Sequence, residues 1–421
     1  MSKKEIIVGL DIGSSFVRTV IVQVIPNEEN LRVIGVGMAP AFGVRRGIIV
    51  DLEEIIKSIN ESIAIAERTA GVEIKYAVTG IGGSHISSQC SKGVIAVGRA
   101  DGEVVADDIS RVINAAQAIS IPPNKEIIHI IPKNYSLDDQ KNIRDPLGMS
   151  GVRLEVDAMI IEGSTPHIKN LNKCIEEAGV VAESFVLSPL AAAKAVLSKR
   201  QKELGVVLVD IGGGSTSVAV FEENDLLRVS VIPIGGNHIT NDIAIGLRTS
   251  VDVAEKIKLE FGNANPKEIG KKENIDLSQI DSSEEGIVSR QHVAEIIEAR
   301  LEEIFMLVNK ELKTIGKECL LPAGAVITGG TAKLPGCVDL AKNTLALPSQ
   351  TGFPIPLGGL VDKIDDPAFA TVIGLILWGQ EESGGQKKTG NSFGNNLVGG
   401  AISEWGGKME GVKKWFGKFL P

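Results

Sequence analysis

The chain has 421 residues, which is enough for two to four folding units. With 44 basic and 53 acidic residues it carries a net charge of −9, which argues against nucleic acid as its main partner. Its four cysteines lack a C-x-x-C spacing and its five histidines lack H-x-x-x-H, so we expect reduced thiols and no zinc site. No apolar run suits a secretion signal or reaches the ~20 residues that a membrane span needs.

Strands alternate with helices along most of the chain, the pattern of an α/β protein. We expect strands at 6–10, 17–24 and 76–81, and a helix at 52–70 whose apolar residues recur at helical spacing. From about residue 84 to residue 162 the sequence pattern changes to short strand-like runs, one helix near 106–118 and several prolines. This change predicts an inserted subdomain.

Helical patterns return at 168–178 and 190–204, and strands are expected at 206–209 and 218–221. Residues 265–291 are polar and irregular, and a long helix with one apolar face is predicted over 291–315. That region predicts a further subdomain.

One unit of sequence occurs twice, 199 residues apart. Each copy has an apolar strand, an aspartate (Asp11 or Asp210), a glycine-rich turn with hydroxyl residues, and a second strand. Such turns expose backbone N–H groups that suit phosphate oxygens, and the aspartates suit the hydrated Mg²⁺ that accompanies a nucleoside triphosphate. The alternative is that both copies are only tight turns, a reading that the duplication weakens.

A third glycine feature is the pair Gly329 and Gly330 at the end of a predicted strand, where a flat base can lie against backbone. The sequence has no G-x-x-x-x-G-K-[ST], and no G-x-G-x-x-G follows a strand. These absences exclude the P-loop and Rossmann families.

Three motifs resemble the phosphate 1, phosphate 2 and adenosine motifs of the actin/Hsp70/sugar-kinase ATPase superfamily, in the expected order. They are residues 11–15, 210–216 and 326–335. Within that superfamily, residues 80–86 and 234–242 resemble the bacterial cell-division family FtsA, over about residues 5–380. The resemblance implies an α/β, actin-like two-lobed fold with a duplicated ATPase core, an inserted small α+β subdomain, a flexible linker and a C-terminal amphipathic helix.

The implied domain boundaries follow from this resemblance. We expect a first lobe of residues 1–83, 163–204 and 365–380, an insertion at 84–162, and a second lobe of residues 205–249 and 317–364. We also expect a small subdomain at 250–316, a flexible linker at 381–400 and a membrane-targeting helix at 401–421.

The resemblance also implies a site for ATP and Mg²⁺. Asp11 and Asp210 would hold the metal through water, and Asp210 would be catalytic. The phosphates would lie against Gly13, Ser14, Ser15, Gly212, Gly213, Gly214, Ser215 and Thr216. Gly235, Gly236 and Asn237 would lie near the nucleotide, Lys256 near the ribose, and Gly329 and Gly330 against adenine.

One position departs from the superfamily pattern. Where many related hydrolases carry Gln, Glu or Asp to orient the attacking water, this chain has Ser188. A hydroxyl is a poor base, so we expect ATP to bind with at most slow hydrolysis.

The end of the chain predicts a tethered membrane anchor. Residues 381–400 contain six Gly, two Ser and three Asn, the composition of a flexible linker. Beyond them an apolar stripe recurs at steps of three and four: Ile402, Trp405, Met409, Val412, Trp415, Phe416, Phe419 and Leu420. Lysines on the other faces (Lys408, Lys413, Lys414, Lys418) give residues 408–421 a charge of +3, which suits anionic lipid. Docking on a protein groove is the alternative.

The resemblance implies an ATP-binding, filament-forming protein at the cytoplasmic face of the bacterial cell membrane, at the division site. It would anchor the FtsZ ring through the FtsZ C-terminal peptide, bound at about 250–316, and recruit later division proteins. Two alternatives stay open: an actin-fold adaptor of type IV pilus assembly similar to PilM, and a small-molecule kinase of the same superfamily.

Overall fold

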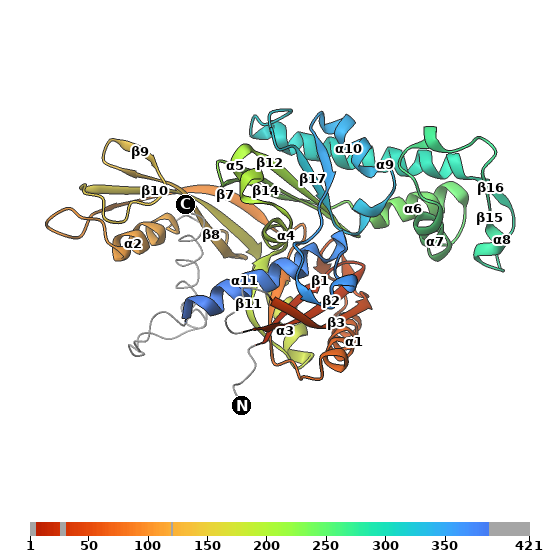
Figure 1. Ribbon diagram of the computed structural model, residues 1–421, viewed down its shortest axis with the longest axis horizontal. Coiled ribbons are helices and arrows are strands. Elements are labelled where there is room, and N and C mark those ends of the chain that lie inside the picture. The colour runs from red at the N-terminus through yellow and green to blue at the C-terminus, as the bar shows by residue number, and fades with distance from the viewer. Residues whose placement is uncertain (1–5, 26–30, 119–120, 387–421) are drawn as a thin grey trace. The chain divides into compact units, whose positions relative to one another are not determined.

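The computed structural model describes residues 6–25, 31–118 and 121–386 (Figure 1). The described residues divide into two compact units, one within 6–86 and 164–375 and the other within 87–163 and 376–386. We call these the body and the inserted unit and describe each by itself.

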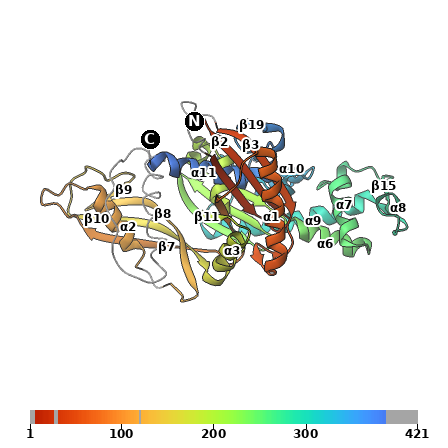
Figure 2. The ribbon, with the colours of Figure 1, turned by 90° about the horizontal axis from the view of Figure 1, so that it is seen from below.

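The first lobe of the body is built on a six-stranded sheet with the order β11-β6-β1-β2-β3-β19. Its strands are β1 (Ile6–Ile12), β2 (Phe16–Val24), β3 (Leu31–Pro40), β6 (Tyr76–Ile81), β11 (Val181–Leu187) and β19 (Gly358–Gly359). Helix α1 (Leu52–Ala70) packs along β3, as Figure 2 shows, because Gly37 places no side chain between that strand and Ser62. Helix α3 (Thr165–Glu177) also belongs to this lobe, as does the small hairpin of β4 (Val44–Arg45) and β5 (Ile48–Ile49).

The second lobe repeats the central part of the first. Its sheet has the order β14-β13-β12-β17-β18, with β12 (Val206–Ile211), β13 (Thr216–Glu222), β14 (Asp225–Ile232), β17 (Ala325–Thr328) and β18 (Ser349–Thr351). In both lobes two antiparallel hairpins (β1-β2-β3 and β12-β13-β14) are extended by a parallel strand, β6 or β17, beside the first strand. The duplication seen in the sequence is therefore a duplication of sheet topology.

The single helix predicted over 190–204 is wrong, because two helices occupy this stretch. They are α4 (Ser188–Val196) and α5 (Lys199–Leu204). Leu197 is extended, and Ser198 caps α5 by accepting a hydrogen bond from the backbone N–H of Gln201. An N-cap serine has non-helical backbone angles, so it ends the preceding helical run.

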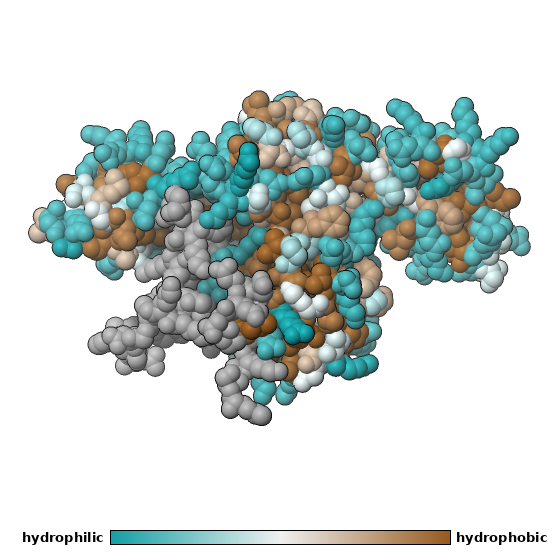
Figure 3. Space-filling view, viewed as in Figure 1, coloured by the Kyte–Doolittle hydropathy of each residue, from teal (hydrophilic) through white to brown (hydrophobic). Residues whose placement is uncertain are grey.

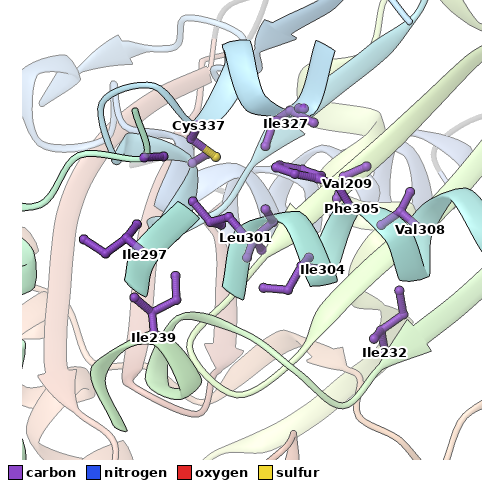
Figure 4. Packing of buried hydrophobic residues seen from close by; sticks show 14 of the residues in the cluster. Val209, Ile232, Ile239, Ile297, Leu301, Ile304, Phe305, Val308, Ile327 and Cys337 are labelled. Atoms are coloured by element: carbon purple, nitrogen blue, oxygen red, sulfur yellow. The ribbon is translucent and has the colours of Figure 1, made fainter. Parts of the chain in front are cut away.

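A largely helical subdomain extends the second lobe. It contains α6 (Gly236–Leu247), α7 (Val251–Phe261), η1 (Pro266–Glu268), β15 (Asn274–Asp276), α8 (Leu277–Ile280), β16 (Ile287–Ser289) and the long α9 (Arg290–Thr314). The apolar face of α9 enters the core of the lobe: Leu301, Ile304, Phe305 and Val308 contact the cluster that includes Val209 (Figure 4). Hydrophilic side chains cover much of this subdomain in the view of Figure 3. Its sequence is thus polar where it meets water and apolar where α9 is buried.

The adenosine motif is followed by η2 (Gly330–Lys333) and α10 (Cys337–Leu345). Two further turns, η3 (Val361–Lys363) and η4 (Pro367–Phe369), lead into the last helix, α11 (Ala370–Gln386).

The inserted unit has a four-stranded sheet with the order β7-β10-β8-β9. Its elements are β7 (Ser87–Ala96), α2 (Ala106–Ala116), β8 (Lys125–Leu137), β9 (Gln140–Ile143) and β10 (Arg153–Ser164). Helix α2 packs on β7, and Val112 and Ala116 join a buried cluster with Leu154 and Val156. The insertion therefore has a hydrophobic core of its own.

The expected linker at 381–400 starts too early, because α11 continues to Gln386. The indole N–H of Trp378 donates to Glu382 Oε1 over 3.2 Å, one turn farther along the helix. The rest of that stretch and the apolar stripe with its lysines at 401–421 lie outside the described residues. Among the described residues no helix has both the length and the apolar character that a bilayer span requires.

Candidate functional site

A cavity of about 920 Å³ lies within the body, at the ends of β1 and β12. Most of the site residues expected from the sequence line it. They are Asp11, Gly13, Ser14, Ser15, Ser188, Asp210, Gly212, Gly213, Gly214, Ser215, Gly236, Asn237, Gly329 and Gly330. Thr216, Gly235 and Lys256 do not line it.

The two glycine-rich turns face each other, and each is closed by an equivalent backbone hydrogen bond. Gly13 N–H donates to the Phe16 carbonyl over 3.1 Å, and Gly212 N–H donates to the Ser215 carbonyl over 3.0 Å. A side chain at Gly214 would begin 2.5 Å from Ser14 Oγ, so glycine is needed for the two turns to approach this closely. The cavity thus places the two turns opposite each other.

Asp11 and Asp210 are the next-to-last residues of β1 and β12, and they pair across their hairpins with Arg18 and Ser217, respectively. Burial, and after it the Asp11 carboxylate, raise the pKa of Asp210 to about 6. Burial also raises the pKa of Asp11. Two neighbouring buried carboxylates with raised pKa values are a site that a cation would stabilise.

Arg18 is a site residue that the sequence reasoning missed. Its guanidinium lies 3.9 Å from Asp11 Oδ2, is largely buried and sits over the rings of Phe16 and Phe369. In the described part of the chain its Nε is buried without a hydrogen-bond partner, as a donor awaiting an anion would be. The signal was present: an arginine stands in the mostly apolar strand directly after the first turn.

Two hydroxyl groups lie beside the aspartates. Thr371 Oγ1, in the first turn of α11, donates to Asp210 Oδ2 over 3.3 Å and was not expected from the sequence. Ser188 Oγ donates to the Ile81 carbonyl over 3.1 Å, so its proton is engaged by the protein. A hydroxyl in this state has no capacity to act as a general base.

The glycine pair after β17 forms an open wall of the cavity. Gly329 has a φ of +87°, and a side chain there would begin 2.6 Å from the Ile211 carbonyl oxygen. At Gly330, by contrast, a Cβ would meet its nearest atom only at 4.0 Å, from Ala368. This space fits a flat ring lying on backbone.

Helix α7 contributes residues other than the one expected. Lys256 donates to the Ile280 carbonyl over 3.4 Å and is exposed. Lys258, two residues later, is buried and lines the cavity with Glu255, whose Oε2 lies 2.6 Å from the Lys258 ammonium. Glu255, Lys258 and Leu259 share one helix face at spacings of three and four, which was the available signal.

Thr216 and Gly235 support the turns from behind. Thr216 Oγ1 donates to the Ile234 carbonyl over 2.8 Å. A Cβ at Gly235 would lie 2.5 Å from the Gly212 carbonyl oxygen, so Gly235 allows close backbone packing beneath the second turn.

The residues present fit a magnesium–nucleotide complex. Two carboxylates, an arginine with an unpaired N–H and two opposed glycine-rich turns match the ligand preferences of Mg²⁺ and phosphate. In the described part of the chain, no cluster of three or more His, Cys, Asp or Glu side chains would chelate a metal directly.

Comparison with known families gives two matches. The family described as cell division protein FtsA matches residues 207–374, and the SHS2 domain inserted in FTSA matches residues 83–162. Relatives named cell division protein FtsA are similar over nearly the whole chain. The one from Pseudomonas aeruginosa is 39% identical over 98% of this chain and 97% of its own length. The one from Bacillus subtilis is 40% identical over 89% and 84%, respectively.

Solved structures show the fold. The PilM–PilN type IV pilus biogenesis complex aligns with a TM-score of 0.65 at 18% identity, covering 89% of this chain and 98% of that one. MreB5 of Spiroplasma citri bound to ADP aligns with a TM-score of 0.53 at 12% identity, covering 91% and 99%. The actin-like fold expected from the sequence is confirmed.

Proposed function

The chain belongs to the FtsA family of cell division proteins, and from this premise we propose that it binds ATP with Mg²⁺ in the cavity of the body. We further propose that it forms actin-like polymers, anchors the FtsZ ring to the cytoplasmic membrane at the division site and recruits later division proteins. The observation that carries the proposal is the pair of opposed turns that follow Asp11 and Asp210.

Each part of the cavity has a role in nucleotide binding. Asp11 and Asp210 would hold hydrated Mg²⁺, which neutralises phosphate charge when bound. Backbone N–H groups of the two turns and the Arg18 guanidinium would bind the phosphates. Gly329 and Gly330 would contact the base, and Glu255 and Lys258 would lie toward the ribose. Lys256 has no place in this proposal, because its ammonium contacts Ile280 instead.

Hydrolysis is expected to be slow. Ser188 occupies the position where a base or a water-orienting group would stand, and its proton is donated to the Ile81 carbonyl. ATP would then act mainly as a conformational and polymerisation ligand. Fast steady-state release of phosphate by the purified protein would contradict this.

The remaining partners are assigned by family membership. The subdomain at 250–316 would bind the FtsZ C-terminal peptide, and the inserted unit would face neighbouring subunits and later division proteins. Residues 401–421 supply a lysine-bordered apolar stripe suited to anionic lipid. A PilM-like adaptor or a small-molecule kinase would not need that stripe.

Nucleotide binding is tested by titrating the full chain with a fluorescent ATP analogue in the presence of Mg²⁺ and again with excess EDTA. We expect saturable binding that unlabelled ATP displaces and that EDTA weakens. Absence of saturable binding in both conditions would overturn the assignment of the cavity.

A further inference from the structure

A short segment of the body, residues 366–371, lies at the carboxyl ends of β12 and β17. Its Pro367 carbonyl oxygen accepts a hydrogen bond from the Gly329 N–H over 3.2 Å, and it lies 3.1 Å from Thr328 Oγ1. Thr328 is the partner of Asp210 in the pairing of β17 with β12. The segment is therefore fastened beside Asp210, one of the two aspartates of the candidate cation site.

Thr371 stands at the end of this segment, as the second residue of α11, and its side chain is buried. Its Oγ1 donates to Asp210 Oδ2 over 3.3 Å. A threonine hydroxyl within a helix commonly donates to the carbonyl four residues earlier, which for Thr371 belongs to Pro367. That carbonyl already accepts from the Gly329 N–H and is within reach of the Thr328 hydroxyl, so the Thr371 hydroxyl is directed to the carboxylate.

The Asp210 carboxylate has few other groups that hold it in place. Among the described residues, Thr371 is its only hydrogen-bond partner, and no ion pair joins it. Its other oxygen, Oδ1, lies against the backbone of Gly329, where a Cβ would begin 2.4 Å away. Asp11 differs, because the Arg18 guanidinium lies 3.9 Å from its Oδ2. Asp210 is thus the aspartate whose orientation depends on a single hydroxyl.

We propose that Thr371 is a positioning residue for the cation: its hydroxyl fixes the rotation of the Asp210 carboxylate before Mg²⁺·ATP binds. The proposal rests on nucleotide binding as proposed above, and it adds the residue that sets the dependence of that binding on the metal. A hydroxyl that donates to a carboxylate favours the ionised form, which is the form that a cation requires. A group that is already ordered in the free protein also loses less entropy when the ligand arrives. Without the hydroxyl, both advantages are lost at Asp210.

The test compares ATP binding by the full chain with and without the metal. A fluorescent ATP analogue is titrated at saturating Mg²⁺ and again with excess EDTA, and the ratio of the two affinities defines the metal enhancement. We expect Thr371→Val to reduce the metal enhancement by about threefold to tenfold, the scale of one net hydrogen bond. Its affinity in EDTA should match that of wild type. With Mn²⁺ in place of Mg²⁺, electron resonance of the bound ion should show a matching loss of metal affinity.

Four further variants separate positioning from general stability. Thr371→Ser keeps the hydroxyl and should restore the enhancement, whereas Thr371→Ala, which suits a helix, is a second variant without it. Thr19→Val removes another buried hydroxyl, which bonds to Ser62 Oγ outside the cavity, and should leave the enhancement unchanged. In an Asp210→Asn background, Thr371→Val should have no further effect on the enhancement, because the carboxylate is gone.

The possible results separate the two proposals. If wild-type protein binds ATP, and Thr371→Val and Thr371→Ala keep its metal enhancement, the positioning proposal is wrong and nucleotide binding stands. An equal loss of affinity with Mg²⁺ and with EDTA, or the same loss of enhancement in Thr371→Ser or Thr19→Val, would mark a structural role and also overturn it. If wild type binds ATP equally well in both conditions, the cation site is wrong as well. If it binds ATP in neither, both proposals are wrong.

Discussion

Ser15 Oγ donates a hydrogen bond to Asn237 Oδ1 over 3.0 Å, joining residues 222 positions apart in the sequence. Ser15 belongs to the turn after β1, and Asn237 is the second residue of α6, next to the turn after β12. The bond ties the two copies of the duplicated unit across the cavity that they enclose.

The buried charge of Asp210 is expected to cost stability in the absence of ligand. Its folded-state pKa is raised to about 6, so its stabilising contribution is complete below the ordinary value of 3.8 and is lost as the pH rises through 6. At pH 7.5, Asp210→Asn should therefore raise the free energy of unfolding of the nucleotide-free protein by about 1–3 kcal/mol, measured by urea denaturation. The same change should weaken Mg²⁺·ATP binding while leaving a measurable residual affinity. A destabilised Asp210→Asn protein would contradict this, with the exposed Asp139→Asn as the control.

Binding should depend on pH through the same carboxyl group. Mg²⁺ requires the carboxylate, and a proton competes for it below about pH 6. The affinity for Mg²⁺·ATP should be constant from pH 7 to 8. Well below pH 6 it should fall about tenfold for each pH unit. The residual binding of the Asp210→Asn variant supplies the control. Its pH profile still includes the titration of the nucleotide but no longer includes protonation of the residue-210 carboxylate. Identical profiles for the two proteins would refute the assignment.

Arg18 is expected to bind phosphate. Arg18→Met keeps much of the packing against Phe16 and Phe369 and removes the guanidinium that lies near Asp11. We expect at least a tenfold loss of ATP affinity, the scale of one charge-assisted contact to phosphate. Arg300→Met, at an ion pair with Asp242 outside the cavity, is the matched comparison. Equal ATP affinity in Arg18→Met and wild type would remove Arg18 from the site.

A side chain at Gly330 should weaken ATP binding and hardly change the stability of the fold. A valine there meets open space in the protein and fills the place assigned to the base. We expect Gly330→Val to unfold at a denaturant midpoint close to that of wild type and to bind ATP at least tenfold more weakly. Gly235→Ala should instead lower the unfolding free energy by about 1–3 kcal/mol, because its Cβ meets backbone. Normal ATP binding by Gly330→Val would place the base elsewhere.

Repeated and periodic features were the ones that could be predicted from the sequence. The helix at 52–70 was predicted to the residue from its apolar residues at helical spacing, and in the structure Asp51 caps it and Gly71 ends it with a left-handed backbone. The aspartates and glycines of the two turns were found because they occur twice. Arg18, Lys258 and Thr371 were missed because their roles depend on which segments the fold brings together: Thr371 meets Asp210 across 161 positions of sequence. Local sequence patterns do not show which distant segments come into contact. The break between α4 and α5 at the extended Leu197 was also missed, because the sequence around it has a continuous helical pattern.

The central claim, that this chain is a membrane adaptor of cell division, is tested most directly by flotation on vesicles of phosphatidylglycerol and phosphatidylcholine with Mg²⁺·ATP present. The full chain is compared with a truncation after Gln386, which keeps α11 whole, and with a Trp405→Glu, Trp415→Glu double variant. We predict that the full chain floats and recruits FtsZ to the vesicles, while both altered chains stay in the dense fraction. A full chain that remains in the dense fraction would contradict the account.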